Sequence, residues 1–328
     1  MPKITMTIKT ATLALLTAIP LSSAAQSGGE SVYPFLSLSA SANYASLGGA
    51  MPSVICGGAS GAFVNPALPD TLCHMSAAAN VVSYVADIHY ASAAYSHRAG
   101  GCEITAGALL LDYGEFQETD EAANETGSFS CRDAMIMASV SRAVMPGLRA
   151  GASLKYIISS MEIYKSHGLA ADLGLYYSIS RHNITLGLTV QNLGRQITTY
   201  SGTRESLPLD IRLGISKKLT HAPLRLSLAI HDINRPKLDE DPAASIADHI
   251  TVGAEIFPDG VFSVKGGFDF MAHNGLHISG GSPFPGFSFG IDVRLSRFSL
   301  QYSHRCVSPA SGANLFTAEI FIGKYLYK

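Results

Sequence analysis

Two acidic runs contain the residues whose types and spacing are best suited to chemistry. Grouped carboxylate oxygens can hold Ca²⁺, but neither run has the spacing of a known calcium-binding loop. The favoured interpretation is a pair of solvated loops, kept soluble by their charge, that form a surface for docking a partner. The first run comprises Asp112, Glu115, Glu118, Asp120, Glu121 and Glu125, and the second comprises Asp239, Glu240 and Asp241.

The spacings typical of catalytic and cofactor sites are missing from the sequence. Glycines are frequent, yet the sequence has no G-x-G-x-x-G motif placed after a predicted strand and before a predicted helix, as a nucleotide-binding loop requires. The glycine-rich runs around Ser60 and Ser282 fail the G-x-S-x-G spacing of a hydrolase nucleophile. The 11 histidines are scattered singly, without H-E-x-x-H. We therefore predict that the protein is not an enzyme and has no cofactor or metal site.

Composition excludes nucleic acid as a partner and points to a membrane. The 328 residues carry 23 Lys and Arg against 25 Asp and Glu, so no basic excess is available to neutralise phosphates. Only 15% of residues are charged, against roughly 25% in an ordinary soluble domain, and 47% are hydrophobic. Beyond the N-terminus, polar residues interrupt every apolar stretch before the roughly 18 residues that a membrane-spanning helix needs.

The N-terminus has the pattern of an export signal. Lys3 and Lys9 precede or flank an apolar run over 11–21, and Ser23-Ala24-Ala25 supplies the small residues that a signal peptidase recognises. We predict that residues 1–25 are a cleavable signal peptide. The mature chain then begins near Gln26, without the cysteine that a lipid anchor requires.

Apolar residues recur at every second position, which is typical of strands with two unlike faces. Leu154 and Lys155 illustrate the two faces. If the strands cross a bilayer, one face meets lipid and the other meets the lumen. The pattern assigns Leu154, Leu213, Leu226 and Phe289 to lipid, and Lys155, Arg212, Arg225 and Arg294 to the lumen.

About 14 such strands predict an all-β fold, a transmembrane antiparallel β-barrel over 74–328. We expect strands at 74–84, 87–98, 102–114, 129–144, 148–164, 168–180, 183–199, 209–220, 223–234, 249–257, 261–270, 286–295, 298–306 and 315–326. Alternate connections are tight, while most of the others are longer, at 115–128, 201–208, 235–248, 271–285 and 307–314. Outer-membrane barrels show this asymmetry, with long loops outside the cell. A soluble β-sandwich or a secreted barrel is the alternative, because alternation also describes a sheet with one buried face.

The segment before the first strand is expected to fill the lumen. Residues 26–73 are rich in Gly, Ala and Ser, and small residues let backbones approach closely. Gly48 and Gly49 lie in one such cluster, and the pair Asn65-Pro66 favours a turn. A barrel of about 14 strands is too wide for wall side chains alone to fill. We therefore predict that 26–73 is a plug, or hatch.

The five cysteines give little guidance. Their number is odd and their spacing wide, without C-x-x-C, so buried small hydrophobic residues are favoured over a disulfide framework.

Beyond these patterns, the chain resembles the PorV/PorQ family within the FadL-like barrel group, outer-membrane proteins of the type IX secretion system. The resemblance runs from about Tyr33 to the C-terminus. Its most specific pieces are YPFL (33–36), ASLGG (45–49), NPAL (65–68), VADIHY (85–90), TDE (119–121), GSF (127–129), LGRQ (193–196), RESLPLDI (204–211) and GISKKLTHAP (214–223). Cysteines at 56, 73 and 131 depart from the pattern expected for the family.

The resemblance implies a non-catalytic barrel that anchors a cell-surface attachment complex. The implied partners are PorZ, with PorU and PorV, a complex that processes secreted cargo and attaches it to lipopolysaccharide. The extracellular loops 115–128, 201–208, 235–248 and 271–285 would form most of the docking surface. The alternative is a FadL-like transporter of hydrophobic small molecules, because a fold does not fix a function. Polar inward faces argue against a transporter.

Overall fold

The computed structural model describes residues 31–49, 51–56, 58–84, 88–120, 124–235, 247–276, 284–308 and 311–323. Residues 31–328 form one compact unit. The predicted signal peptide and the first residues of the predicted hatch lie outside the described part of the chain.

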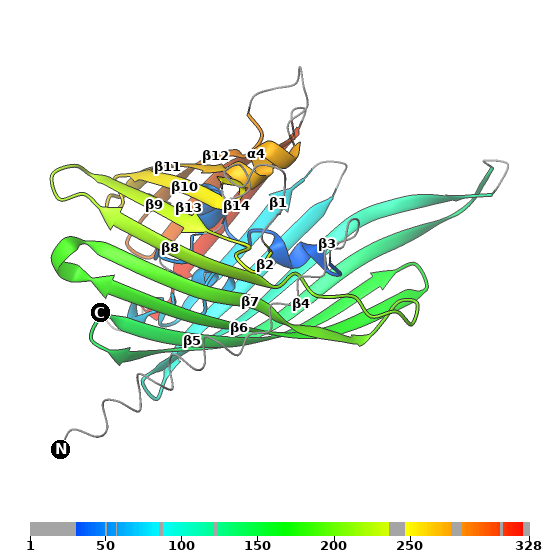
Figure 1. The fold of residues 1–328 in the computed structure, drawn as a ribbon, viewed down its shortest axis with the longest axis horizontal. Helices are drawn as coiled ribbons and strands as arrows, with labels where there is room; N and C mark the ends of the chain where they lie inside the picture. Colours follow the sequence, from blue (N-terminus) through cyan, green and yellow to red (C-terminus); the bar gives the residue numbers. More distant parts are fainter. Residues whose placement is uncertain are drawn as a thin grey trace. The chain divides into compact units, whose positions relative to one another are not determined.

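Fourteen antiparallel strands close into a barrel in the described unit, in which β1 pairs with both β2 and β14 (Figure 1). The strands are β1 (Ser76–Ser83), β2 (His89–Ala99), β3 (Cys102–Thr119), β4 (Glu125–Met145), β5 (Leu148–Met161), β6 (Tyr164–Ile179), β7 (Ile184–Thr198), β8 (Asp210–Lys218), β9 (Leu224–Ile230), β10 (Ile250–Ile256), β11 (Phe262–Asp269), β12 (Phe287–Arg294), β13 (Phe298–Ser308) and β14 (Ser311–Phe321). The predicted all-β barrel of about 14 strands is therefore confirmed.

The alternation of the sequence sets the two faces of the wall. Leu213 is 47% exposed on the outer face, whereas Lys155 is 3% exposed and faces inward. The other residues assigned from the pattern follow it: Leu154, Leu226 and Phe289 are exposed on the outside, and Arg212, Arg225 and Arg294 form ion pairs inside. The predicted faces are confirmed, and closure satisfies the backbone groups that an open edge would leave unpaired.

The connections at the two ends of the barrel differ, but less simply than predicted. At the end where β1 begins and β14 stops, called here the turn side, strands are joined by tight turns such as Gly100-Gly101 and Pro146-Gly147. At the opposite end, the loop side, 199–209 is an irregular loop, and the connection after β11 begins with the helix α4 (Phe270–Leu276).

Three loop-side predictions were wrong. Residues 115–128 are mostly strand, because β3 and β4 continue to Thr119 and from Glu125. Residues 307–314 also lie largely in β13 and β14. The β5–β6 turn falls at Glu162, which adopts a left-handed φ of 55°, rather than near Lys165. In the first two cases the strands pair beyond the end of the hydrophobic pattern, with breaks in register on the way. In the third case β5 ends earlier and β6 begins earlier than predicted.

Among the described residues before β1, the only helices are short, and these residues lie against the inward face of the wall. The helices are η1 (Pro34–Ser37), α2 (Ala42–Ala45), η2 (Ala59–Phe63) and η3 (Thr71–Cys73). Described residues 31–73, called the hatch below, form hydrogen bonds with inward-facing side chains from strands around the barrel: Ser92 of β2, Ser141 of β4, Ser216 of β8, Ser288 of β12 and Thr317 of β14.

Within the described residues, no helix has both the length and the apolar character needed to cross a membrane. All five cysteines are free, and Cys56, Cys73 and Cys131 are buried.

Candidate functional site: the filled lumen and the projecting ribbon

The hatch rests on wall glycines whose missing side chains make room for its backbone. A Cβ added to Gly187 would collide with the Pro52 carbonyl, and one added to Gly151 would collide with the carbonyl of Pro66. Gly187 lies directly opposite Gly214 in the β7–β8 pairing. Sequence analysis did not single out these wall glycines, because the residues that approach them are more than 80 positions away in the chain.

Asn65 and Pro66 of the predicted hatch motif lie at the centre of this contact. The Asn65 side chain is fully buried and donates from Nδ2 to the carbonyl oxygens of Pro52 and Leu175, at 3.0 and 3.1 Å. Its Oδ1 accepts from the Ala67 backbone N–H at 2.9 Å, which forms an Asx turn. Asn65 therefore shapes the hatch turn and also joins the hatch to β6.

Gly48 and Gly49 end the α2 turn on the other side of the lumen. Both have φ near +93°, a left-handed conformation that glycine adopts without steric cost. The Gly49 N–H donates to the Tyr44 carbonyl at 2.8 Å. A Cβ on Gly48 would overlap the Thr251 side chain of β10. These two positions of the motif therefore allow the chain to turn while staying against the wall.

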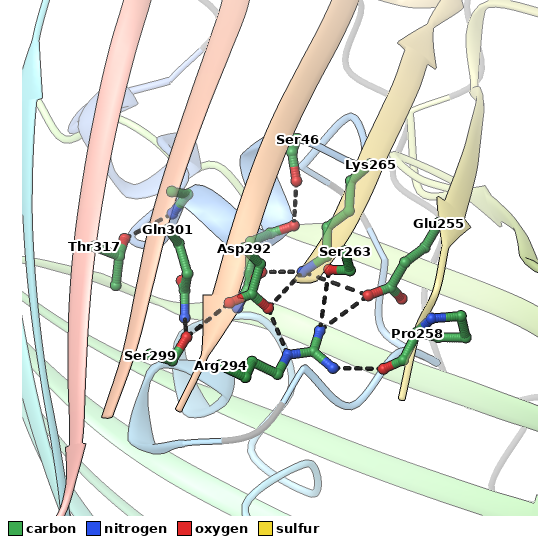
Figure 2. Close-up of polar contacts among 12 residues, drawn as sticks. Ser46, Glu255, Pro258, Ser263, Lys265, Asp292, Arg294, Ser299, Gln301 and Thr317 are labelled. Carbon is green, nitrogen blue, oxygen red and sulfur yellow. Dashed lines mark hydrogen bonds and ion pairs between the residues drawn. The ribbon is translucent and has the colours of Figure 1, made fainter. Parts of the chain in front are cut away.

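A cluster of buried ion pairs lies on the β10–β12 wall and contacts α2 through Lys265 (Figure 2). Lys265 Nζ lies 3.6 Å from Glu255 Oε1 and 3.4 Å from Asp292 Oδ2, and all three side chains are about 1% exposed. Lys265 also donates to Asn43 Oδ1 of the hatch. Arg294 completes the cluster, with its Nη2 3.0 Å from Glu255 and its Nε 2.6 Å from Asp292.

A second buried ion pair stands across the lumen. Lys155 Nζ of β5 lies 2.7 Å from Asp172 Oδ2 of β6 and donates to Asn192 Oδ1 at 2.9 Å. Together the two networks show that much of the inner wall is charged but internally paired. Such pairs fix geometry, because removal of one partner leaves a buried charge uncompensated.

The inner wall also has an apolar region, contrary to the expectation of polar inward faces throughout. Leu109, Met135 and Ile157 are buried on β3, β4 and β5, toward the loop side. Tyr33 and Phe35 of the hatch pack in this cluster, with exposed fractions of 2% and 1%. The Tyr33 hydroxyl lies 2.5 Å from Ser166 Oγ of β6. The hatch therefore occupies the apolar part of the lumen itself.

Outside the barrel, β3 and β4 extend beyond their neighbours as a two-stranded ribbon (Figure 1). Pairing of β3 with β2 ends at Asp112, and pairing of β4 with β5 begins at Cys131. Residues 113–119 and 125–130, called the ribbon below, therefore pair only with each other. At its centre the rings of Phe116 and Phe129 stack with centroids 5.5 Å apart.

The first predicted acidic run lies on this ribbon. Glu118 and Glu125 are exposed on β3 and β4, and Asp120 at the tip accepts hydrogen bonds from Asn124. Glu115 accepts from the Ser128 hydroxyl. Glu121 and the whole second run, Asp239, Glu240 and Asp241, lie outside the described residues. In the part of the chain that is described, no three His, Cys, Asp or Glu residues form a group that could hold a metal ion.

No protein-family model matches the sequence, and no curated protein sequence matches it. Among solved structures, a deltaS2 mutant of the TodX monoaromatic hydrocarbon channel is similar, with a TM-score of 0.55 at 14% identity over 85% of this chain and 97% of that one. The Pseudomonas putida toluene transporter TodX gives a TM-score of 0.52 at 12% identity over 84% and 95%. A Pseudomonas aeruginosa FadL homologue gives 0.48 at 11% over 86% and 98%. The likeness to the two TodX structures shows that the protein shares their barrel fold.

Proposed function

We propose that the protein is a non-catalytic outer-membrane barrel that anchors a protein complex on the cell surface. The resemblance of the sequence to the PorV/PorQ family names the complex as the attachment complex of the type IX secretion system, with PorZ as the direct partner beside PorU and PorV. On this proposal the loop side is extracellular and both ends of the barrel domain are periplasmic.

The observation that carries the proposal is the ribbon. A two-stranded hairpin is only marginally stable in water, and each of its edges presents unpaired backbone groups. This ribbon carries Glu115, Glu118 and Glu125 without a single Lys or Arg between 113 and 130. An exposed aromatic pair within an acidic surface suits a partner with a basic rim and an apolar centre.

The filled lumen supports an anchor more than an open channel. The hatch rests on glycines of one wall and accepts a hydrogen bond from Lys265 of the other, and its aromatic side chains occupy the apolar cluster. Passage of a solute through the barrel would require all of these contacts to separate.

Transport of a hydrophobic small molecule remains the second candidate. Its support is the fold shared with TodX, a toluene transporter, and the apolar cluster around Phe35. A transported molecule would have to displace Tyr33 and Phe35, because these side chains already fill that space.

Capture from the native membrane tests the proposal. The tagged full-length protein is extracted in mild detergent, and co-purifying proteins are identified by mass spectrometry. We expect PorZ with the wild type, and little PorZ when 115–128 are replaced by an Asn-Gly turn. The heat-dependent gel shift of folded barrels checks that the trimmed chain is folded. Equal capture of PorZ by both chains would favour the transporter hypothesis. So would cells lacking the protein that keep PorZ on their surface but no longer take up an apolar nutrient.

A further inference from the structure

A groove of about 480 Å³ lies on the outer face of the barrel wall, away from the hatch. Its volume is within the roughly 300–1,000 Å³ of small-ligand pockets. The side chains that line its outer surface are apolar: Ile136, Ala138, Leu154, Leu169, Ala171 and Leu193, from β4, β5, β6 and β7. Because these residues face outward, the proposed anchoring function does not use them.

The register of four strands explains the groove. In one row across the wall, Ala138 lies opposite Leu154, Leu154 opposite Ala171, and Ala171 opposite Leu193. Small side chains alternate with large ones, so Ala171 leaves a gap between Leu154 and Leu193. Beside this row, the β6–β7 pairing shifts between Ala171 and Leu173, where Asn192 takes a left-handed φ of 59°. The bulge turns the strand locally and adds to the depression.

Cationic side chains lie at the loop-side end of the groove. Arg195 is exposed on the outer face, directly opposite Leu169, in the row Tyr156–Leu169–Arg195. Lys165 is exposed further toward the loop side on the same face of β6. Neither cation forms an ion pair with a described residue. Between them, His167 shares a 3.0 Å hydrogen bond with the Tyr156 hydroxyl.

An unpaired arginine on a lipid-facing wall needs an explanation. A cation on this face is costly at the bilayer midplane and costs little near the interface. Arg195 lies close to the end of β7 at Thr198, so it reaches the interface on the loop side. Its charge is therefore placed where phosphate groups of lipids lie, directly above an apolar groove.

We propose that this groove binds a phosphorylated glycolipid of the outer leaflet, of the lipid A class. One acyl chain lies along Leu154, Ala171 and Leu193, and Arg195 and Lys165 bind a phosphate. The proposal rests on the outer-membrane location and loop-side orientation proposed above. It selects the glycolipid over a phospholipid because the groove opens on the extracellular half of the wall.

Native mass spectrometry of the delipidated full-length protein in detergent tests this site. The probes are diphosphoryl lipid A, the same lipid without its phosphates, and phosphatidylglycerol. We expect diphosphoryl lipid A to bind about tenfold more tightly than its dephosphorylated form, as ionised hydrogen bonds allow. Arg195→Gln should remove that preference. Lys217→Gln, which removes an exposed cation from the turn-side end of β8, should leave it unchanged.

A second pair of variants tests the apolar half of the groove. Ala171→Leu fills the groove from the lipid side and should weaken both forms of lipid A. Ala318→Leu, on the outward face of β14 and separated from the groove by β1, β2 and β3, should weaken neither. The proposal is overturned if phosphatidylglycerol binds as tightly as lipid A, if removal of the phosphates has no effect, or if Arg195→Gln binds like the wild type.

The two proposals fail separately. The ribbon-trimmed chain should keep its lipid A binding even if PorZ is not its partner, and Arg195→Gln should keep PorZ capture. If Arg195→Gln lost PorZ while lipid binding was unchanged, the cation would belong to the docking surface and the lipid site would be wrong.

Discussion

The hatch and the ribbon differ in how their backbone N–H and C=O groups find hydrogen-bond partners. The hatch has four short helical turns in more than forty residues, yet most of it is buried. The ribbon is β-strand throughout, with two breaks in register, yet its side chains are largely exposed. Wall side chains such as Gln191 supply the hydrogen bonds that the hatch backbone lacks, donating to the carbonyls of Phe63 and Val64 at 2.9 and 2.8 Å.

This contrast indicates where binding capacity remains. Most polar groups of the hatch named above already have a partner inside the barrel, so the hatch has little left to offer a ligand. The ribbon has two unpaired edges, an aromatic pair and an acidic surface, so it can still bind. Regular secondary structure is therefore a poor guide to which region is fixed and which is available.

The largest effect is expected from Lys265, which forms the buried ion pairs of the β10–β12 wall and donates a hydrogen bond to the hatch. Lys265→Met removes the cation between Glu255 and Asp292 and should cost about 3–5 kcal/mol of folding free energy, because buried carboxylates lose a partner. Urea titration of the refolded barrel in detergent measures it. Lys218→Met, which breaks an exposed pair with Asp259, should cost no more than about 1 kcal/mol. Equal losses of folding free energy for the two variants would mean that water reaches the Lys265 cluster.

The outer wall should differ from the ribbon in its tolerance of charge. Leu213→Arg places a cation on the lipid face and should cost about 2–4 kcal/mol near mid-membrane. Phe116→Arg on the exposed ribbon should change barrel stability by less than about 0.5 kcal/mol. Refolding into lipid vesicles at a series of urea concentrations compares them. A similar loss for both variants would place the ribbon in lipid.

Gly187→Leu should displace the hatch from the wall glycines. Overpacking at this contact should lower the free energy of unfolding by about 1–3 kcal/mol. Cys56 reports the displacement, because burial raises the pKa of this thiol and keeps the reactive thiolate scarce. Once the hatch is displaced, the pKa falls toward its ordinary value and alkylation at neutral pH speeds up.

The matched control is Gly266→Leu, an outward-facing glycine whose nearest atom is the Ser288 carbonyl oxygen at 3.9 Å from an added Cβ. Peptide mapping of the alkylated protein separates Cys56 from the other four cysteines. If Gly187→Leu left the rate of Cys56 alkylation unchanged, the wall glycines would not be what holds the hatch in place.

The smallest effect is expected from the charges of the ribbon. Combined Glu118→Gln, Asp120→Asn and Glu125→Gln keeps the strand pairing but removes the acidic surface, so PorZ should dock several-fold more weakly and with less dependence on salt. Association rates at two ionic strengths measure this. A salt dependence identical to that of the wild type would remove these carboxylates from the docking surface.

Most of the barrel was predictable from the sequence because its signal is local. Alternation within a strand depends on residues two positions apart, so the sequence alone assigned Leu213 to the lipid face and Arg212 to the lumen. The extent of β3 was not predictable in this way. Beyond Asp112 both faces of the strand meet water, and the alternation that marks a strand disappears.

The site was less predictable because its contacts are distant in the chain. The residues around Gly187 in the sequence give no sign that the Pro52 carbonyl packs against it. The pairing of Lys265 with both Glu255 and Asp292 depends on how the strands assemble into the barrel. Asn65 and Gly48 were identifiable, since turn chemistry is local. The apolar cluster around Phe35 was missed because its wall residues alternate like any others.

A comparison of two chains in cells that lack the wild-type protein tests the central claim most directly. One chain has 115–128 replaced by an Asn-Gly turn, and the other carries Gly187→Leu; surface PorZ is measured for both. The account predicts that the trimmed chain loses PorZ from the surface while the Gly187→Leu chain retains it. Retention by the trimmed chain together with loss by Gly187→Leu would contradict the account, because docking would then depend on the lumen and not on the ribbon.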